Sequence, residues 1–116
     1  MSFRRTIDQW PSRSLVRGAA VVNEDGFLVH DELGSGLDGE AIAALAVTLH
    51  RHARQLGAAA DAGHLGSVVL ELDRGPAILA ALDDRHTLVV LARPDRDFGQ
   101  LLYDIRSARA DLARVI

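Results

Sequence analysis

The chain has 116 residues, of which 48% are hydrophobic and 25% are charged, and its formal net charge at pH 7 is −3. This length and balance are typical of one globular domain, and the slightly acidic charge does not favour nucleic acid or a membrane as a partner. The chain has no cysteine, and arginine supplies all 13 of its basic residues. Disulfides, thiol catalysis and lysine-dependent chemistry, including a Walker A phosphate loop, are therefore excluded.

The first residues predict a short helix. Phe3, Ile7 and Trp10 share one face at helical spacing, Ser2 can cap the helix, and Pro11 can end it. Because so short a helix is unstable alone, we expect it to dock on the rest of the chain. The segment lacks the apolar core of a signal peptide, and no apolar run reaches the roughly 20 residues needed to cross a bilayer, so we expect a cytoplasmic location.

Two strands and a long helix are predicted next. Residues 15–22 form an apolar run, the turn sequence at residues 23–26 ends in Asp-Gly, and residues 27–33 read as the partner strand of a hairpin. Asp38 is a good N-terminal cap for a helix that runs to about Ala62 and stops at Gly63. Six apolar positions of this helix fall within about 100° of arc, and we expect that stripe to be buried: Ile42, Leu45, Ala46, Leu49, Ala53 and Leu56.

Three more strands and a last helix complete the chain. Ser67 to Asp73 alternates in polarity, residues 77–82 and 87–92 are apolar, and Asp97 can cap a helix that runs to the end. Strands that are apolar on both faces need cover on both faces. The sequence therefore predicts a three-layer α/β/α sandwich with a five-stranded, mainly antiparallel sheet and the order (short α)-β-β-α-β-β-β-α.

This order of elements resembles the Roadblock/dynein light chain family. Residues 18–29 (GAAVVNEDGFLV) are similar to the first hairpin of the family, in which an acidic-Gly turn joins two apolar strands. Residues 88–99 (LVVLARPDRDFG) are similar to its last strand, loop and start of the final helix. The resemblance assigns residues 15–116 to a Roadblock-like domain and leaves residues 1–14 as a short N-terminal segment, where family members commonly have a fuller amphipathic helix.

The resemblance implies a non-catalytic protein that works through its surfaces. Family members dimerise by pairing edge strands, with their middle helices side by side on one face. They serve as partners, scaffolds or regulators of small Ras-like GTPases, or as adaptors in motor complexes, and bacterial members of the MglB type act on a partner GTPase and have no nucleotide site themselves. The expected partners are thus a second copy of the chain and a small Ras-like GTPase, with no cofactor.

The candidate dimer interface lies on the strand from Ser67 to Asp73 and on the long helix. An edge strand with unpaired backbone groups is a template for pairing, and the alternative is that Glu71 and Asp73 protect the edge of a monomer. On the helix, small residues opposite the expected buried stripe allow a second helix to approach closely. The interface residues are Val68, Val69, Leu70, Glu71, Ala44 and Val47.

The same helix face carries the candidate partner-binding residues Arg51, Arg54 and Ala58. Arg51 and Arg54 are neighbours at i, i+3 spacing. They could contact an acidic or nucleotide-bound partner, supply an arginine finger in trans, or simply form a solvated helix face. Contact without catalysis is the interpretation that we carry forward.

No residue pattern indicates an enzyme or a metal site. His50 and His52 are two positions apart on a helix and cannot share one ion, and the other histidines, His30, His64 and His86, lie in separate elements. No serine has a nucleophile elbow around it. Arg109 falls near the apolar stripe of the last helix, where its stem can line the edge of the core. The alternative functions are a small-molecule-sensing domain, which would need a cavity with convergent polar groups, and a general adaptor in a signalling complex.

Overall fold

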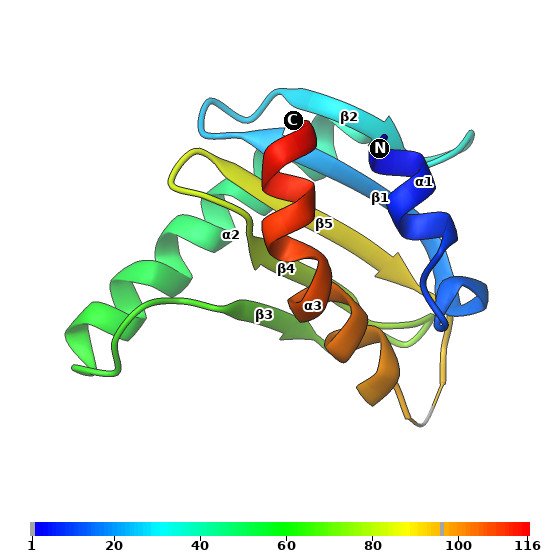
Figure 1. Cartoon of the computed structure of the whole chain (residues 1–116). Coiled ribbons are helices and arrows are strands. Elements are labelled where there is room, and N and C mark those ends of the chain that lie inside the picture. The colour runs from blue at the N-terminus through cyan, green and yellow to red at the C-terminus, as the bar shows by residue number, and fades with distance from the viewer. Residues whose placement is uncertain (1, 96) are drawn as a thin grey trace.

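The computed structural model describes residues 2–95 and 97–116, and Met1 and Arg96 lie outside the described residues. Three helices and five strands follow one another in the predicted order (Figure 1). Their bounds are α1 (Phe3–Asp8), β1 (Val16–Asn23), β2 (Leu28–Glu32), α2 (Gly39–Ala59), β3 (Ser67–Leu70), β4 (Ala77–Ala81), β5 (His86–Ala92) and α3 (Gly99–Val115), with a short 3-10 turn at Arg13–Leu15.

The five strands form one sheet in the order β2-β1-β5-β4-β3, and every neighbouring pair is antiparallel. In Figure 1, α1 and α3 cover the front of this sheet and α2 lies behind it. The central strands β1 and β5 are almost entirely buried, as their apolar composition predicts. The predicted three-layer sandwich and its antiparallel sheet are confirmed.

The larger core lies between the sheet and the pair α1 and α3. Phe3, Ile7 and Trp10 are buried in this core beside sheet residues such as Ile78 and Leu88. Ser2 caps α1, since its side chain accepts a hydrogen bond from the backbone N–H of Arg5 at 3.2 Å. Burying a large apolar side chain contributes roughly 1.5–3 kcal/mol, which is how so short a helix is held in place. The expected docking of the N-terminal helix is confirmed.

A buried carboxylate joins this N-terminal segment to α3. One carboxylate oxygen of Asp104, Oδ2, accepts hydrogen bonds from the backbone N–H of Ser12 at 3.0 Å and from its hydroxyl at 2.6 Å. The other oxygen accepts from the side-chain amide of Gln100 at 2.8 Å. Asp104 is 5% exposed and Ser12 is 4% exposed. The hydrogen bonds between them therefore pair polar groups that burial would otherwise leave without a partner.

The hairpin between β1 and β2 forms as predicted. Gly26 has φ +83°, a left-handed conformation that glycine adopts without steric cost. The side-chain oxygen of Asn23 accepts from the backbone N–H groups of Asp25 and Phe27, both at 3.0 Å, and closes the turn. The local sequence alone therefore determines this connection.

The long helix α2 turns a different face to the sheet from the one predicted. Its buried residues are Ala43, Ala46 and His50, whereas Leu45 and Leu56 are 69% and 70% exposed. The buried face is thus turned by roughly 80° from the expected stripe. The expectation of burial was wrong for these two leucines, because small side chains let the helix lie close to the sheet and the bulky leucines extend past it.

Two element ends lie three residues from their predicted positions, and the N-cap position of α3 is occupied by Phe98 instead of Asp97. Helix α2 ends at Ala59 instead of Ala62, because Asp61 takes a left-handed conformation (φ +54°) ahead of Gly63. Strand β3 ends at Leu70 instead of Asp73, because the chain already turns between Leu72 and Gly75 to return as β4. None of the helices in the described part of the chain is long and apolar enough to span a membrane.

Candidate functional site

Strand β3 is an edge of the sheet and pairs with β4 alone in the described structure. Val68 lies opposite Leu79 and packs on the α2 side, and Val69 lies opposite Ile78 on the other face and is 37% exposed. Leu70 is half-buried, whereas Glu71 follows the end of the strand and is exposed. The predicted interface residues Val68, Val69 and Leu70 therefore share an edge whose outer backbone groups have no strand partner among the described residues.

Helix α2 leaves apolar side chains in solvent, and its Leu49 packs against the same small core as Val68 of β3. Leu45 and Leu56 are exposed, and Ile42, Leu49 and Ala53 are half-buried on the same side of the helix. We call these five residues the α2 leucine face. The sequence predicts the apolar stripe itself, but it does not show that Leu45 and Leu56 lie away from the chain's own sheet.

Two of the predicted interface residues lie elsewhere on α2. Val47 packs on the core between α2 and the sheet. A β-carbon placed on Gly26 would lie 3.4 Å from a methyl carbon of Val47 and 3.6 Å from the Cα of Ala44, so both residues stand against the β1–β2 turn. Ala44 and Val47 are thus not grouped with β3 or with the α2 leucine face.

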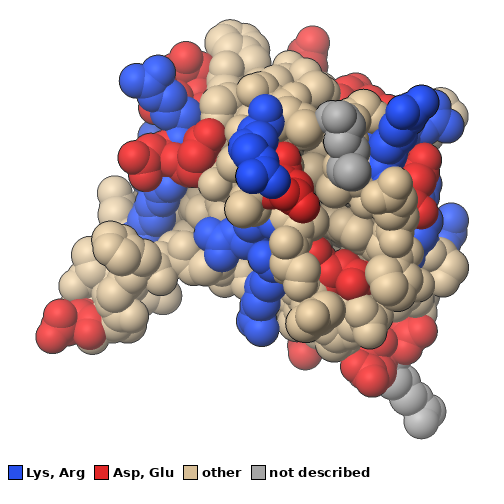
Figure 2. All heavy atoms as spheres, viewed as in Figure 1, with Lys and Arg blue, Asp and Glu red and all other residues tan. Residues whose placement is uncertain are grey.

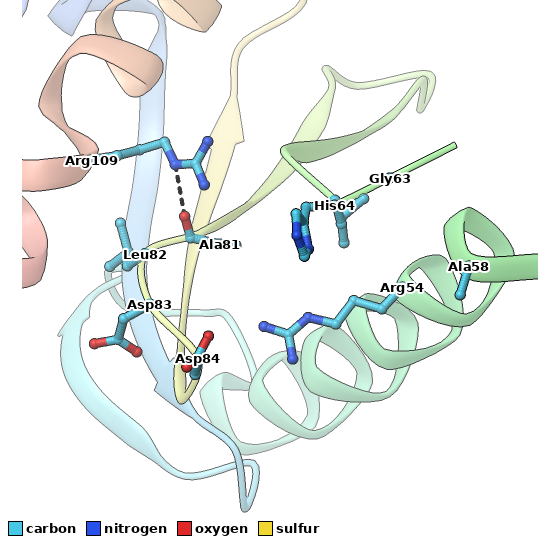
Figure 3. A pocket seen from close by; sticks show the side chains of 10 residues that line it. Arg54, Ala58, Gly63, His64, Ala81, Leu82, Asp83, Asp84 and Arg109 are labelled. Carbon is cyan, nitrogen blue, oxygen red and sulfur yellow. Dashed lines mark hydrogen bonds between the residues drawn. The ribbon is translucent and has the colours of Figure 1, made fainter. Parts of the chain in front are cut away.

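The three predicted partner-binding residues do lie on one flank of α2. Arg54 and Ala58 line a cavity of about 450 Å³, and Arg51 and Arg54 line an adjoining one of about 130 Å³. The larger cavity opens between the C-terminal half of α2, the β4–β5 turn and α3, and Figure 3 shows Arg54 and Arg109 directed toward it from two helices. Arg109 does lie at the edge of the core, where its Nε donates to the backbone oxygen of Ala81 at 2.7 Å.

His50, on this same flank, is 4% exposed and was not singled out by the sequence. Its Nδ1 is hydrogen-bonded to the hydroxyl of Thr87 on β5, and its Nε2 is buried without a partner among the described residues. Burial lowers the pKa of His50, and the positive charges of Arg54 and Arg109 lower this pKa further. The imidazole is therefore neutral at pH 7.

Charges are mixed over the face of the molecule seen in Figure 2, where arginine and acidic side chains alternate. Within residues 2–95 and 97–116, no three histidine or acidic side chains are close enough together to hold a metal ion. His30 stacks on Phe3 with ring centroids 5.2 Å apart, and His86 pairs with Asp83 at 2.9 Å. These two histidines thus have structural partners.

Comparison with known proteins identifies similar chains. The family model of the Roadblock/LC7 domain matches residues 11–92, and no curated protein matches the chain. The solved Roadblock/LC7 domain from Streptomyces avermitilis shares 25% identity, with a TM-score of 0.70 over 94% of this chain and 92% of the other.

Two other solved structures show the same fold at lower identity. Myxococcus xanthus MglB is 14% identical, with a TM-score of 0.81 over 99% of this chain and 97% of its own. A structure of MglB in a tetrameric arrangement is 16% identical, with a TM-score of 0.79 over 97% of this chain and 88% of its own.

Proposed function

Since this chain belongs to the Roadblock/LC7 domain family, we propose that it is a homodimeric, non-catalytic regulator or scaffold that binds a small Ras-like GTPase in the cytoplasm. The observations that carry the dimer are the exposed α2 leucine face and the edge of β3, which has no strand partner in the described structure. Membership of the family and the resemblance of the two local sequence segments carry the link to a GTPase. The proposal takes residues 15–116 as the family domain and residues 1–14 as a segment that covers its outer face.

The dimer that fits these surfaces has two-fold symmetry. Antiparallel pairing of β3 with the β3 of a second copy satisfies the unpaired backbone groups, and extends the sheet across both protomers. The same rotation sets the two α2 leucine faces against each other, so that Leu45 and Leu56 leave water. MglB has been solved in a tetrameric arrangement, which supports self-association in this fold.

Glutamate substitutions in the α2 leucine face test the dimer. Burying a leucine contributes roughly 1.5–3 kcal/mol, and a two-fold interface contains each leucine twice. We therefore expect Leu45→Glu with Leu56→Glu to weaken association by at least ~100-fold, measured by sedimentation equilibrium. Tyr103→Glu is the matched control, because Tyr103 is 65% exposed on α3, in the other helix layer. A wild-type chain that stays monomeric at all concentrations would contradict the dimer.

Binding of the small GTPases encoded in the same genome tests the second half of the proposal. Each GTPase is loaded with GDP or with a non-hydrolysable GTP analogue and presented to the immobilised chain. We expect one GTPase to bind with a preference for one nucleotide state, and Arg51→Gln with Arg54→Gln to weaken that binding. Hydrolysis assays with the bound GTPase then separate a regulator from a scaffold. If none of these GTPases binds in either state, the GTPase proposal is wrong even if the dimer is confirmed.

A further inference from the structure

The cavity at the end of the sheet, where β4 turns into β5, has the size of a small-molecule site. Its volume is about 450 Å³, within the range of roughly 300–1,000 Å³ that is typical of ligand pockets. Arg54 and Ala58 of α2, residues 63–65, residues 81–84 and Arg109 of α3 form its wall (Figure 3). The wall thus combines side chains from both helix layers with two loops.

Two arginines supply the positive charge of this cavity. The hydrogen bond from Nε of Arg109 to the backbone oxygen of Ala81 fixes its guanidinium and leaves the two terminal nitrogens to face the cavity. Arg54 reaches in from the opposite side (Figure 3). Neither guanidinium has an ion-pair partner among the residues that the structure describes. Two convergent guanidinium groups repel each other, and an anion between them relieves that repulsion.

The acidic residues of the wall compensate only part of this charge. Asp83 is occupied within its own turn, where it accepts from the backbone N–H of Arg85 at 2.8 Å and pairs with His86. Its carboxylate points away from Arg54 in Figure 3. Asp84 lines both cavities and makes no hydrogen bond through its side chain within the described structure. The wall of the larger cavity therefore carries two guanidinium groups, and among the described residues only the carboxylate of Asp84 is available to compensate their charge.

His50 provides an independent indication of a ligand. The smaller cavity, of about 130 Å³, shares Arg54 and Asp84 with the larger one and is also lined by His50. In the tautomer that we assign to the neutral imidazole, Nδ1 accepts the hydroxyl proton of Thr87 and Nε2 carries the ring proton. That nitrogen is buried and has no partner among the described residues, and leaving such a donor unpaired is costly.

We propose that Arg54, Arg109 and His50 bind a small organic anion through a phosphate or carboxylate group. The planar fork of arginine matches both kinds of oxyanion, and the N–H of His50 adds a third donor. The site is compatible with the proposed dimer but does not depend on it. Arg54 and Leu56 are two positions apart on α2 and point about 160° away from each other, so covering the α2 leucine face leaves the cavity open.

Sodium pyrophosphate and sodium succinate are the probes, each titrated into ¹⁵N-labelled protein with sodium chloride holding the ionic strength constant. We expect saturable shifts of the Nε–Hε signals of Arg54 and Arg109 and of the imidazole nitrogens of His50. The signal of Arg106, an exposed arginine of α3 outside both cavities, serves as the internal control. Binding of either probe supports the site, and their relative affinities distinguish phosphate from carboxylate.

Three substitutions test the site, and two of them should weaken binding of the probes whereas the third should strengthen it. Arg54→Gln and Arg109→Gln each remove a charge-assisted contact and are expected to weaken binding by about tenfold or more. Asp84→Asn removes the opposing carboxylate and is expected to strengthen binding several-fold. Because the side chain of Asp84 makes no hydrogen bond in the described structure, we expect the Asp84→Asn variant to fold. This variant therefore still tests the site if an arginine variant folds poorly. Shifts that do not saturate, shifts equally large at Arg106, or an Asp84→Asn variant that binds no better than wild type would overturn the proposal.

Discussion

Replacing Asp104 with alanine tests whether a buried carboxylate holds the N-terminal segment to α3. The substitution removes the acceptor of the Ser12 backbone N–H and of the Ser12 hydroxyl, at 3.0 and 2.6 Å. Ser12 is 4% exposed, so water cannot replace the lost acceptor without a local rearrangement. Each buried polar group left unpaired costs about 1–3 kcal/mol. The side chain of Gln100 is exposed and can turn to water, so we expect a total loss of about 3 kcal/mol.

Equilibrium unfolding in urea measures this loss. Trp10 is the single tryptophan of the chain and is buried in the docked segment, so its fluorescence reports both global unfolding and release of the segment. A domain of this size is stable by roughly 5–15 kcal/mol, and Asp104→Ala should therefore still fold. Asp111→Ala is the matched control, since Asp111 is an exposed acid of the same helix that pairs with Arg114 on the surface. We expect it to change stability by less than about 0.5 kcal/mol.

A double-mutant cycle with Ser12→Ala separates the hydrogen bonds from other effects of the substitution. We expect Ser12→Ala alone to cost about 1 kcal/mol, and the pair to be less destabilised than the sum of the two single variants. If Asp104→Ala costs no more than Asp111→Ala, or if the two substitutions add without coupling, the carboxylate does not hold the segment and the reasoning is refuted.

Three further predictions use the same unfolding assay. Gly75→Ala should lower the free energy of unfolding by more than about 2 kcal/mol, because φ is +121° and the new β-carbon would lie 2.9 Å from the carbonyl carbon of Ala92. Gly36→Ala is the control, since Gly36 also has a positive φ but faces open space, and it should cost only about 1 kcal/mol. Equal costs for the two variants would contradict this reason. Phe3→Ala should cost about 3 kcal/mol, since Phe3 is 2% exposed, and a near-neutral result would mean that α1 is not docked. The pKa of His50 is lowered by burial and by nearby arginines, so the unfolded state binds more protons than the folded state as the pH falls through 6.5. The free energy of unfolding should therefore decrease below that pH. His50→Asn should make this decrease less steep, and an unchanged dependence between pH 7.5 and 5.5 would contradict the prediction.

Much of the fold was predictable because its signals are local. A period of two or of 3.6 residues in the apolar pattern distinguishes strand from helix, and Gly26 and Asp38 act on their nearest neighbours in the chain. The edge position of β3 was also predicted, because the resemblance to a family made this strand the candidate dimer edge. The length of β3 was not predicted. Within the described part of the chain β3 pairs only with residues 77–80 of β4, and a strand continues only as far as its partner does.

The paired polar groups could not be predicted, because their members lie far apart in the sequence. Asp104 and Ser12 are 92 positions apart, and His50 and Thr87 are 37 apart. Nothing in the neighbourhood of either residue indicates which partner it will meet. The partner-binding prediction did group Arg51 and Arg54 correctly on one flank of α2, because i, i+3 spacing on a helix is a local relation. That Arg109 converges on the same cavity depends on how α3 packs.

The sequence by itself determined the order of the elements, the hairpin turn, the cap of α2 and the presence of an apolar stripe on that helix. Only the tertiary structure decided where the stripe points. An apolar pattern says that a face avoids water, and it does not say whether the chain's own sheet or another molecule covers that face. The small residues Ala43 and Ala46 pack closely on the sheet, and Leu45 and Leu56 consequently remain exposed.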